Sequence, residues 1–124
     1  MKILSINSTS FSPKARKKKE IKYIIVHYTG MQSKRVSIDR LKSKKHKVSC
    51  HYLIDRAGFI ARMVGDNSVA WHAGKSRWKN LINLNERSIG IELVNKGHKF
   101  GYEKFSKKQI NSLVKLCLKL KAKY

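Results

Sequence analysis

Four apolar segments of the chain predict β-strands, at 21–27, 50–55, 59–64 and 88–94. Segment 21–27 is apolar almost throughout, which is typical of a central strand covered by helices on both faces. Segments 50–55 and 59–64 are joined by a short turn, in which Gly58 can adopt the positive φ that a tight hairpin requires. These two segments therefore predict an antiparallel hairpin.

A short helix is predicted at 36–45. Ile38 and Leu41 lie three residues apart, and lysines surround them. The preceding Ser37 belongs to the residue types that cap helix N-termini. This segment is therefore expected to pack one apolar side on the sheet and to expose a lysine-rich side.

A longer amphipathic helix is predicted near the C-terminus. Ser106 and Gln109 have the spacing of a capping box, in which each side chain bonds to the backbone of the other residue. Apolar residues follow at helical spacing. They are Ile110, Leu113, Val114, Cys117 and Leu118. These side chains are expected to form the face that packs on the sheet.

The remaining segments have no apolar periodicity. Residues 1–20 are polar and basic, and they predict an irregular basic N-terminal arm. Residues 66–85 predict a long loop of the kind that often carries function. Because strands and helices are mixed, without repeats or linkers, residues 1–124 are expected to form one α/β domain with a mixed central β-sheet flanked by helices.

The charge of the chain narrows the choice of partners. Its 124 residues include 29 basic and 7 acidic ones, a formal net charge of +22. The lysines are dispersed and lack interleaved aromatic residues, so we expect no specific nucleic-acid binding but attraction to a polyanionic substrate. No apolar run is long enough to span a membrane or to form a secretory leader. We therefore expect a soluble, cytoplasmic protein, and the two cysteines favour a reducing compartment because they are too few for a disulfide scaffold. We also expect a monomer.

Two polar residues stand in apolar strand segments, where polar residues are costly to bury. They are His27, at the end of its segment, and Glu92, in the middle of Ile-Glu-Leu. Each has an ordinary explanation, as a satisfied core histidine and as a carboxylate on an exposed sheet face. Together they indicate zinc hydrolysis, because an imidazole-held zinc ion acidifies water and a carboxylate takes its proton.

Two further pairs of residues are candidates for the same cleft. His51 and Tyr52 begin a strand segment, and Trp71 and His72 lie in the long loop. Their side chains could hydrogen-bond an acyl substrate or its oxyanion. We assign no role to the two histidines among lysines and glycine, and we expect both cysteines to be core residues. These four are His46, His98, Cys50 and Cys117.

Five segments in order resemble the zinc-dependent N-acetylmuramoyl-L-alanine amidase family, which is related to phage lysozyme-type amidases and peptidoglycan recognition proteins. The segments are 10–16 (SFSPKAR), 26–31 (VHYTGM), 48–55 (VSCHYLID), 70–74 (AWHAG) and 85–98 (NERSIGIELVNKGH). Among these enzymes, the pattern is most similar to the cytoplasmic amidases of muropeptide recycling. The resemblance implies an amidase fold and hydrolysis of the amide between the muramoyl lactyl group and L-alanine.

The resemblance also implies roles for individual residues. His27 would be the first zinc ligand, and Glu92 the catalytic carboxylate. Candidates for the substrate groove are His51, Tyr52, Trp71, His72 and Asn95. Arg87 would attract the carboxylates of the peptide. The expected partners are peptidoglycan fragments such as anhydro-muropeptides.

The chain departs from the family at its C-terminus. The resemblance implies a second histidine ligand, an aspartate or cysteine ligand and an assisting lysine in a segment after the last helix, and the sequence ends at Tyr124. A C-terminally truncated amidase domain is therefore expected. A non-catalytic muropeptide-binding module is the alternative. A three-histidine site that recruits His51, His72 or His98 is disfavoured, because His51 and His72 match family positions that are not ligands.

Overall fold

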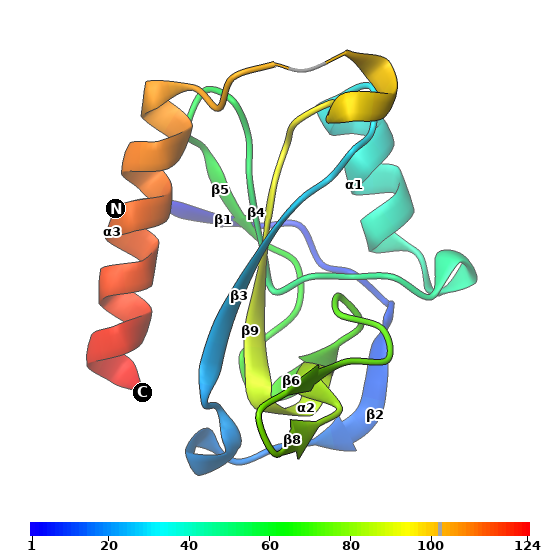
Figure 1. Cartoon of the computed structure of the whole chain (residues 1–124), viewed down its shortest axis with the longest axis vertical. Coiled ribbons are helices and arrows are strands. Elements are labelled where there is room, and N and C mark those ends of the chain that lie inside the picture. Colours follow the sequence, from blue (N-terminus) through cyan, green and yellow to red (C-terminus); the bar gives the residue numbers. More distant parts are fainter. Residues whose placement is uncertain (102) are drawn as a thin grey trace.

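The computed structural model describes residues 1–101 and 103–124. A five-stranded mixed sheet lies between two helices (Figure 1), which confirms the predicted α/β class. In spatial order the strands are β1 (Ile3–Ser5), β5 (Ile60–Arg62), β4 (Tyr52–Ile54), β9 (Ser88–Leu93) and β3 (Tyr23–Tyr28). Among the described strands of this sheet, only the β4 and β5 pair is antiparallel. Helix α1 (Lys34–Lys42) covers one face, and helix α3 (Lys107–Lys123) covers the other.

The predicted hairpin is confirmed as β4 and β5. Ile54 and Ile60 pair across the turn, and Gly58 has a φ of 88°. A Cβ atom at Gly58 would lie 2.8 Å from the Lys108 carbonyl oxygen. The glycine therefore satisfies both the turn conformation and the close approach of α3.

Strand β3 is not the central strand that its apolar run predicts. It pairs with β9 alone and forms an edge of the sheet, so Val26 is 44% and Tyr28 46% exposed. The central strands are β4 and β9. An apolar run shows that a strand is partly covered, but its place in the sheet depends on pairing with residues far away in sequence.

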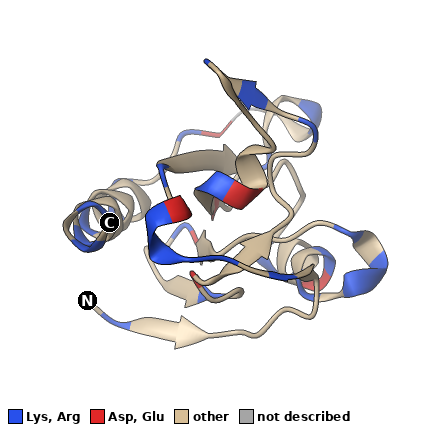
Figure 2. Ribbon diagram, turned by 90° about the horizontal axis from the view of Figure 1, so that it is seen from below, with Lys and Arg blue, Asp and Glu red and all other residues tan. Residues whose placement is uncertain are grey.

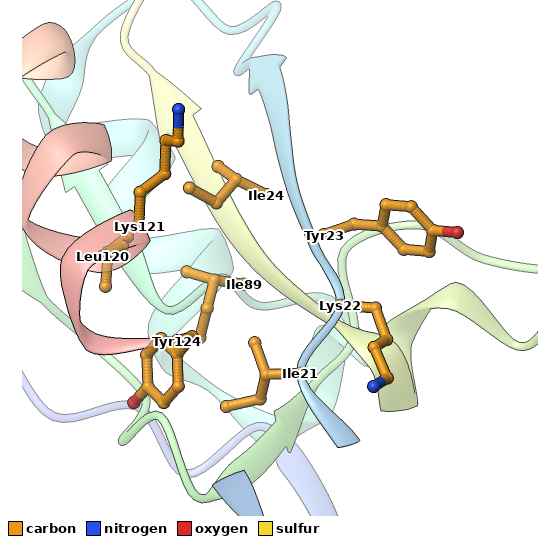
Figure 3. A pocket seen from close by; sticks show the side chains of 8 residues that line it. All are labelled: Ile21, Lys22, Tyr23, Ile24, Ile89, Leu120, Lys121 and Tyr124. Carbon is orange, nitrogen blue, oxygen red and sulfur yellow. The ribbon is translucent and has the colours of Figure 1, made fainter. Parts of the chain in front are cut away.

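An open cavity of about 560 Å³ separates β3 from α3. Figure 3 shows that Ile21, Ile24 and Ile89 point toward α3, whereas Tyr23 points away from it. The complete lining is Ile21, Lys22, Tyr23, Ile24, Ile89, Leu120, Lys121 and Tyr124. Apolar surface therefore borders the open edge of the sheet.

The N-terminal twenty residues are not the irregular arm that their composition predicts. They form β1, strand β2 (Phe11–Ala15) and the short 3-10 helix η1 (Lys18–Glu20). β1 extends the main sheet, and β2 pairs with β6 (Ser68–Ala70). Strands this short have too few residues to show a periodicity, so only their partners reveal them.

The segment predicted as a long loop contains paired strands. Besides β6, it includes the small hairpin of β7 (Arg77–Trp78) and β8 (Leu81–Ile82). A single turn of helix, α2 (Leu84–Arg87), then leads into β9. The segment therefore has defined structure at its beginning and end.

Helix α1 begins earlier than predicted. Its cap is Ser33, whose Oγ accepts a hydrogen bond from the Val36 amide at 3.2 Å. Ser37, the predicted cap, is buried inside the helix and donates its hydroxyl proton to the Ser33 carbonyl oxygen at 2.8 Å. A 3-10 turn, η2 (Lys44–His46), follows the helix.

Helix α3 has the predicted serine cap without the reciprocal bond of a capping box, and its buried face matches the prediction only in part. Ser106 Oγ accepts a hydrogen bond from the Gln109 amide at 3.1 Å. The Gln109 side chain turns inward, where Nε2 donates to the carbonyl oxygens of Ile54 and Val94, each at 3.0 Å. Leu116 and Leu120 form the buried face with Gln109, and two of the predicted core residues, Leu113 and Cys117, pack partly buried against the same core. Three predicted core residues are instead exposed, namely Ile110, Val114 and Leu118.

This rotation of the helix face predicts a difference between neighbouring leucines. Leu116→Ala should lower the free energy of unfolding by about 2–5 kcal/mol, because Leu116 is completely buried in the core. Leu118→Ala should change it by no more than about 0.5 kcal/mol, because Leu118 is 60% exposed. Urea denaturation of the two variants measures the difference. Equal destabilisation would contradict the assignment of the buried face.

Positive charge surrounds the sheet. Lysine and arginine positions lie on both long helices and in loops on several sides of the molecule (Figure 2). Within the described residues, no helix is both long and apolar enough to cross a membrane. Cys50 and Cys117 are both free cysteines, and Cys50 is buried.

Candidate functional site

The site is built on the face of the sheet that lies opposite α3. Alternate residues of β9 point to opposite faces, so Ile89 and Ile91 enter the core beneath α3 while Gly90 and Glu92 lie on the other face. His27 of β3 is the register partner of Glu92. Adjacent strands are about 4.8 Å apart. The structure therefore brings together the two polar residues that stand out in the apolar strand segments.

Glu92 is held in an unusual electrostatic environment. Its Oε2 atom is buried and has no hydrogen-bond partner among the described residues. Burial raises the pKa of the Glu92 carboxyl to about 8. Burial, together with the Glu92 charge, also raises the pKa of the Cys50 thiol. A carboxyl group whose pKa lies close to neutral pH can accept a proton and return it within one reaction.

The imidazole of His72 lies over Gly90. A Cβ atom at position 90 would be only 2.3 Å from His72 Cγ, so the ring fills the space that a side chain would occupy. The backbone around the ring is held by Asn85, whose Oδ1 accepts hydrogen bonds from the amides of His72 (3.1 Å) and Ala73 (2.8 Å). The glycine thus admits a histidine from a distant loop to the face of β9.

The hydrogen bonds of His72 define its tautomer. The Ser88 hydroxyl donates its one proton to the Leu84 carbonyl oxygen at 2.6 Å, so it accepts from His72 Nε2 at 3.0 Å. His72 Nδ1 is then an acceptor, and His27 Nε2 donates to it at 2.9 Å. Burial, followed by the charges of His51, His27 and Arg16, lowers the pKa of His72 to about 3, so the ring is neutral.

His27 is consequently oriented by His72. Its Nε2 proton is used in the hydrogen bond between the two rings, whose centroids are 5.1 Å apart. Burial lowers the pKa of His27, which favours the neutral ring. The lone pair of Nδ1 then remains available for a ligand.

His51 and Tyr52 do not line a groove, which corrects their predicted place. His51 is completely buried; its Nδ1 accepts from the Gly90 amide at 3.0 Å, and Nε2 donates to the Ser68 carbonyl oxygen at 2.8 Å. Burial is the main cause that lowers the pKa of His51 to about 4. Tyr52 is 2% exposed and donates its hydroxyl proton to Asp66 Oδ1 at 2.8 Å. Both residues support the site from within the fold.

The other three predicted groove residues lie in different settings. Asn95 is buried and shapes the following loop, since its side chain contacts the Glu103 carbonyl oxygen and the Gly97 amide. Arg87 is half-buried at the end of α2, and Trp71 is half-buried beside a cavity of about 170 Å³. Of the predicted groove residues, Trp71, His72 and Arg87 therefore remain accessible.

Four residues of the site have no role in the sequence-based prediction. They are Arg16, Asn85, Ser88 and Gly90. Gly90 has a signal in the sequence, because a glycine between two isoleucines of a strand indicates close approach by another group. Arg16 lies in a lysine-rich segment that hides it, and the roles of Asn85 and Ser88 depend on contacts with the distant His72.

The described residues do not complete a zinc site. A catalytic zinc ion takes three protein ligands and leaves one position open for water. His27 Nδ1 is a suitable donor, but the residues that the structure describes include no group of three His, Cys, Asp or Glu side chains that could hold a metal ion. The donors supplied by the described residues therefore do not fit a catalytic zinc ion.

Comparison with known proteins identifies the relatives of this arrangement. The Escherichia coli K12 N-acetylmuramoyl-L-alanine amidase AmiD is 34% identical over 116 residues, which cover 84% of this chain and 41% of AmiD. The structure of E. coli AmiD in complex with the substrate anhydro-N-acetylmuramic acid-L-Ala-D-gamma-Glu-L-Lys is similar, with a TM-score of 0.77 and 33% identity. The match covers 91% of this chain and 47% of that one.

A second solved structure agrees with the first. AmpDH3 from Pseudomonas aeruginosa, in complex with an anhydromuramic pentapeptide, has a TM-score of 0.75 and 30% identity; the match covers 96% of this chain and 52% of that one. The chain thus spans about half the length of these relatives. Residues 17–124 match the family model described as N-acetylmuramoyl-L-alanine amidase, and the chain belongs to this family.

Proposed function

We propose that the chain contributes the catalytic face of an enzyme that hydrolyses the amide between N-acetylmuramic acid and L-alanine in anhydro-muropeptides. The observation that carries this proposal is the buried Glu92 Oε2, without a hydrogen-bond partner among the described residues and in register with His27. The substrate named for AmiD supports the choice of substrate class. In the cell, the proposed reaction would belong to the recycling of peptidoglycan fragments.

Glu92 is the proposed general base and acid. Its carboxylate takes a proton from the attacking water, whose oxygen bonds to the lactyl carbonyl carbon. When the tetrahedral intermediate collapses, the carbon–nitrogen bond breaks and the same proton passes to the amine of L-alanine. With a pKa of about 8, the carboxyl group can pass its proton to the leaving amine near neutral pH, and the carboxylate form that accepts a proton from water increases as the pH rises toward 8.

Substrate contacts are proposed for the accessible residues of the site. His72 borders the reacting face beside His27, and Trp71 precedes it in the same segment. Arg87 provides positive charge for the peptide carboxylates. The net charge of +22 would attract such an anionic substrate from a distance.

Zinc is the proposed cofactor, with His27 as the ligand supplied by the described residues. Because these residues do not form a complete ligand set, the proposed proton transfers involve only Glu92 of this chain. The same observation favours a second candidate function, a non-catalytic module that binds muropeptides. We also propose a cytoplasmic, monomeric protein, and the two free cysteines support a reducing compartment.

His27→Ala tests the site and separates the two candidate functions. Peptide release from anhydro-N-acetylmuramic acid-L-Ala-D-gamma-Glu-L-Lys, followed by chromatography with and without added zinc, is expected to fall at least about 100-fold. His46→Ala, at an exposed histidine of η2, is the matched control and should retain full activity. Calorimetric binding of the muropeptide by the unmodified chain, without any release of peptide with or without zinc, would instead favour the binding module.

A further inference from the structure

Arg16 is the only lysine or arginine that is buried among the described residues, with 5% of its surface exposed. A buried guanidinium is costly unless hydrogen bonds satisfy its donors. The cluster around Arg16 contains no direct ion pair with a carboxylate among the contacts described. Its donors instead meet backbone carbonyl oxygens, which points to a role in fixing the chain rather than in balancing charge.

The two carbonyl groups belong to the two ends of one segment. Arg16 Nε donates to the Asp66 carbonyl oxygen and Nη1 donates to the Asn85 carbonyl oxygen, each at 3.0 Å. The Arg16 amide also donates to the Asn67 carbonyl oxygen at 2.9 Å. One side chain therefore closes the base of segment 66–85, which carries His72.

The Asp66 end of this segment is fixed to other parts of the fold, whereas the Asn85 end is bonded back to the middle of the segment. The Asp66 carboxylate accepts hydrogen bonds from the hydroxyl groups of Tyr52 (2.8 Å) and Tyr124 (2.6 Å). Asn85 holds the amides of His72 and Ala73 through Oδ1. The chain of contacts from the guanidinium thus reaches the backbone of His72 through a single residue, Asn85.

The same guanidinium also lies beside the second support of the His72 ring. Arg16 Nη2 packs 3.1 Å from Nε2 of His51, a contact between two donors and not a hydrogen bond, and His51 Nδ1 accepts from the amide of Gly90, the residue beneath His72. The ring centroids of His51 and His72 are 6.0 Å apart. Arg16 therefore contacts the residues that hold His72 from two directions.

We propose that Arg16 is a positioning residue: its guanidinium closes segment 66–85, so that Asn85 places the His72 ring over Gly90 and against His27. The effect on catalysis rests on the proposed amidase function. The effect on the ring does not, because the tautomer of His72 can be measured without a substrate.

The first measurement is nitrogen NMR of the histidine rings in the full chain, labelled with 15N-histidine. The unmodified chain should show a neutral His72 with its proton on Nε2. Arg16→Ala and Arg16→Lys should both lose this single tautomer, because lysine keeps the charge but lacks the planar fork that reaches two carbonyl groups. Arg40→Ala, at an exposed arginine of α1, is the control and should leave the signal unchanged.

The second measurement is kinetic. Arg16→Ala should lower kcat about 100-fold, as expected for a misplaced catalytic constellation, with KM changed only a few-fold. Millimolar guanidinium, compared with sodium chloride at equal ionic strength, should restore part of kcat in Arg16→Ala but not in Arg16→Lys, whose side chain fills the site. Should Arg16→Ala fail to fold, Asn85→Ala tests the same contact chain, because it removes only the link to the His72 backbone.

These measurements distinguish failure of the positioning role of Arg16 from failure of the proposed amidase function. A His72 tautomer that survives in Arg16→Ala, or in Asn85→Ala if that variant must be used, would overturn the proposal. An unmodified chain that lacks amidase activity, but whose His72 tautomer depends on Arg16, would refute the proposed function and support the positioning role. In an active chain, losses of kcat in Arg16→Ala and Asn85→Ala that add fully in the double variant would contradict a single path through Asn85.

Discussion

Glu92→Gln is expected to reduce peptide release by about 100- to 10,000-fold, the range for removal of a general acid–base group. The amide of glutamine has nearly the same shape as the carboxyl group but cannot take a proton from water. Release of peptide from the anhydro-muropeptide, measured at saturating substrate, gives the loss in kcat. Asp39→Asn, at an exposed carboxylate of α1, is the control for removing one negative charge.

The same variant should be more stable than the unmodified chain at high pH. Burial raises the pKa of Glu92 from 4.5 to about 8 in the folded chain, so below pH 4.5 the group is protonated in both states. As the pH rises from 4.5 to 8, the unfolded chain releases this proton while the fold retains it. The fold therefore loses stability over this window, by about 4 kcal/mol in total.

Thermal denaturation at pH 4 and pH 8.5 measures this effect. Glu92→Gln should match the unmodified chain at pH 4 and melt at a higher temperature at pH 8.5, whereas Asp39→Asn should show no such difference. A variant that is inactive without being stabilised at pH 8.5 would contradict the raised pKa. Retained activity would contradict the assignment of Glu92 as the base.

Gly90→Ala should damage both the fold and the site. The new Cβ atom would lie 2.3 Å from His72 Cγ, so the ring must move away from β9 and from His27. Overpacking of this kind costs about 1–3 kcal/mol in the free energy of unfolding. A displaced His72 also loses its hydrogen bond to His27, and a misplacement of about 1 Å can cost about 100-fold in activity.

Gly65→Ala is the matched control for this variant. A Cβ atom at Gly65 would have no neighbour within 4 Å, and Gly65 does not have a positive φ. Its free energy of unfolding should change by no more than about 0.5 kcal/mol. Urea denaturation and peptide release of the two variants provide the comparison. Equal behaviour of the two variants would show that His72 does not depend on the space above Gly90.

The central pair of the site could be predicted from the sequence, because polar side chains are unusual inside apolar strand segments. His27 and Glu92 lie in apolar segments, and the parallel register of β3 and β9 places them side by side. The resemblance to the amidase family points to the same two residues. The hairpin at Gly58 is predictable for a related reason, since a local turn determines which strands pair.

Features that depend on distant partners could not be predicted in this way. The edge position of β3 is set by its pairing with β9, in which His27 pairs with Glu92, 65 residues later in the sequence. The buried face of α3 is set by Gln109, whose inward hydrogen bonds to two strand carbonyl groups give no apolar signal. The Asp66 carbonyl group that Arg16 binds is 50 residues away in sequence, and the amides that Asn85 binds are 12 and 13 residues away. The roles of Arg16 and Asn85 therefore appear only in the folded chain.

The excess of lysine and arginine keeps copies of the chain apart, which matters because the edge of β3 is open. An edge strand that is flanked by apolar surface offers unpaired backbone groups to a second copy of the chain. A net charge of +22 opposes that contact over a distance set by the ionic strength, about 10 Å at 0.1 M salt and about 3 Å at 1 M. Salt concentration therefore determines how closely two copies can approach, and concentrated salt removes the repulsion that protects the exposed strand.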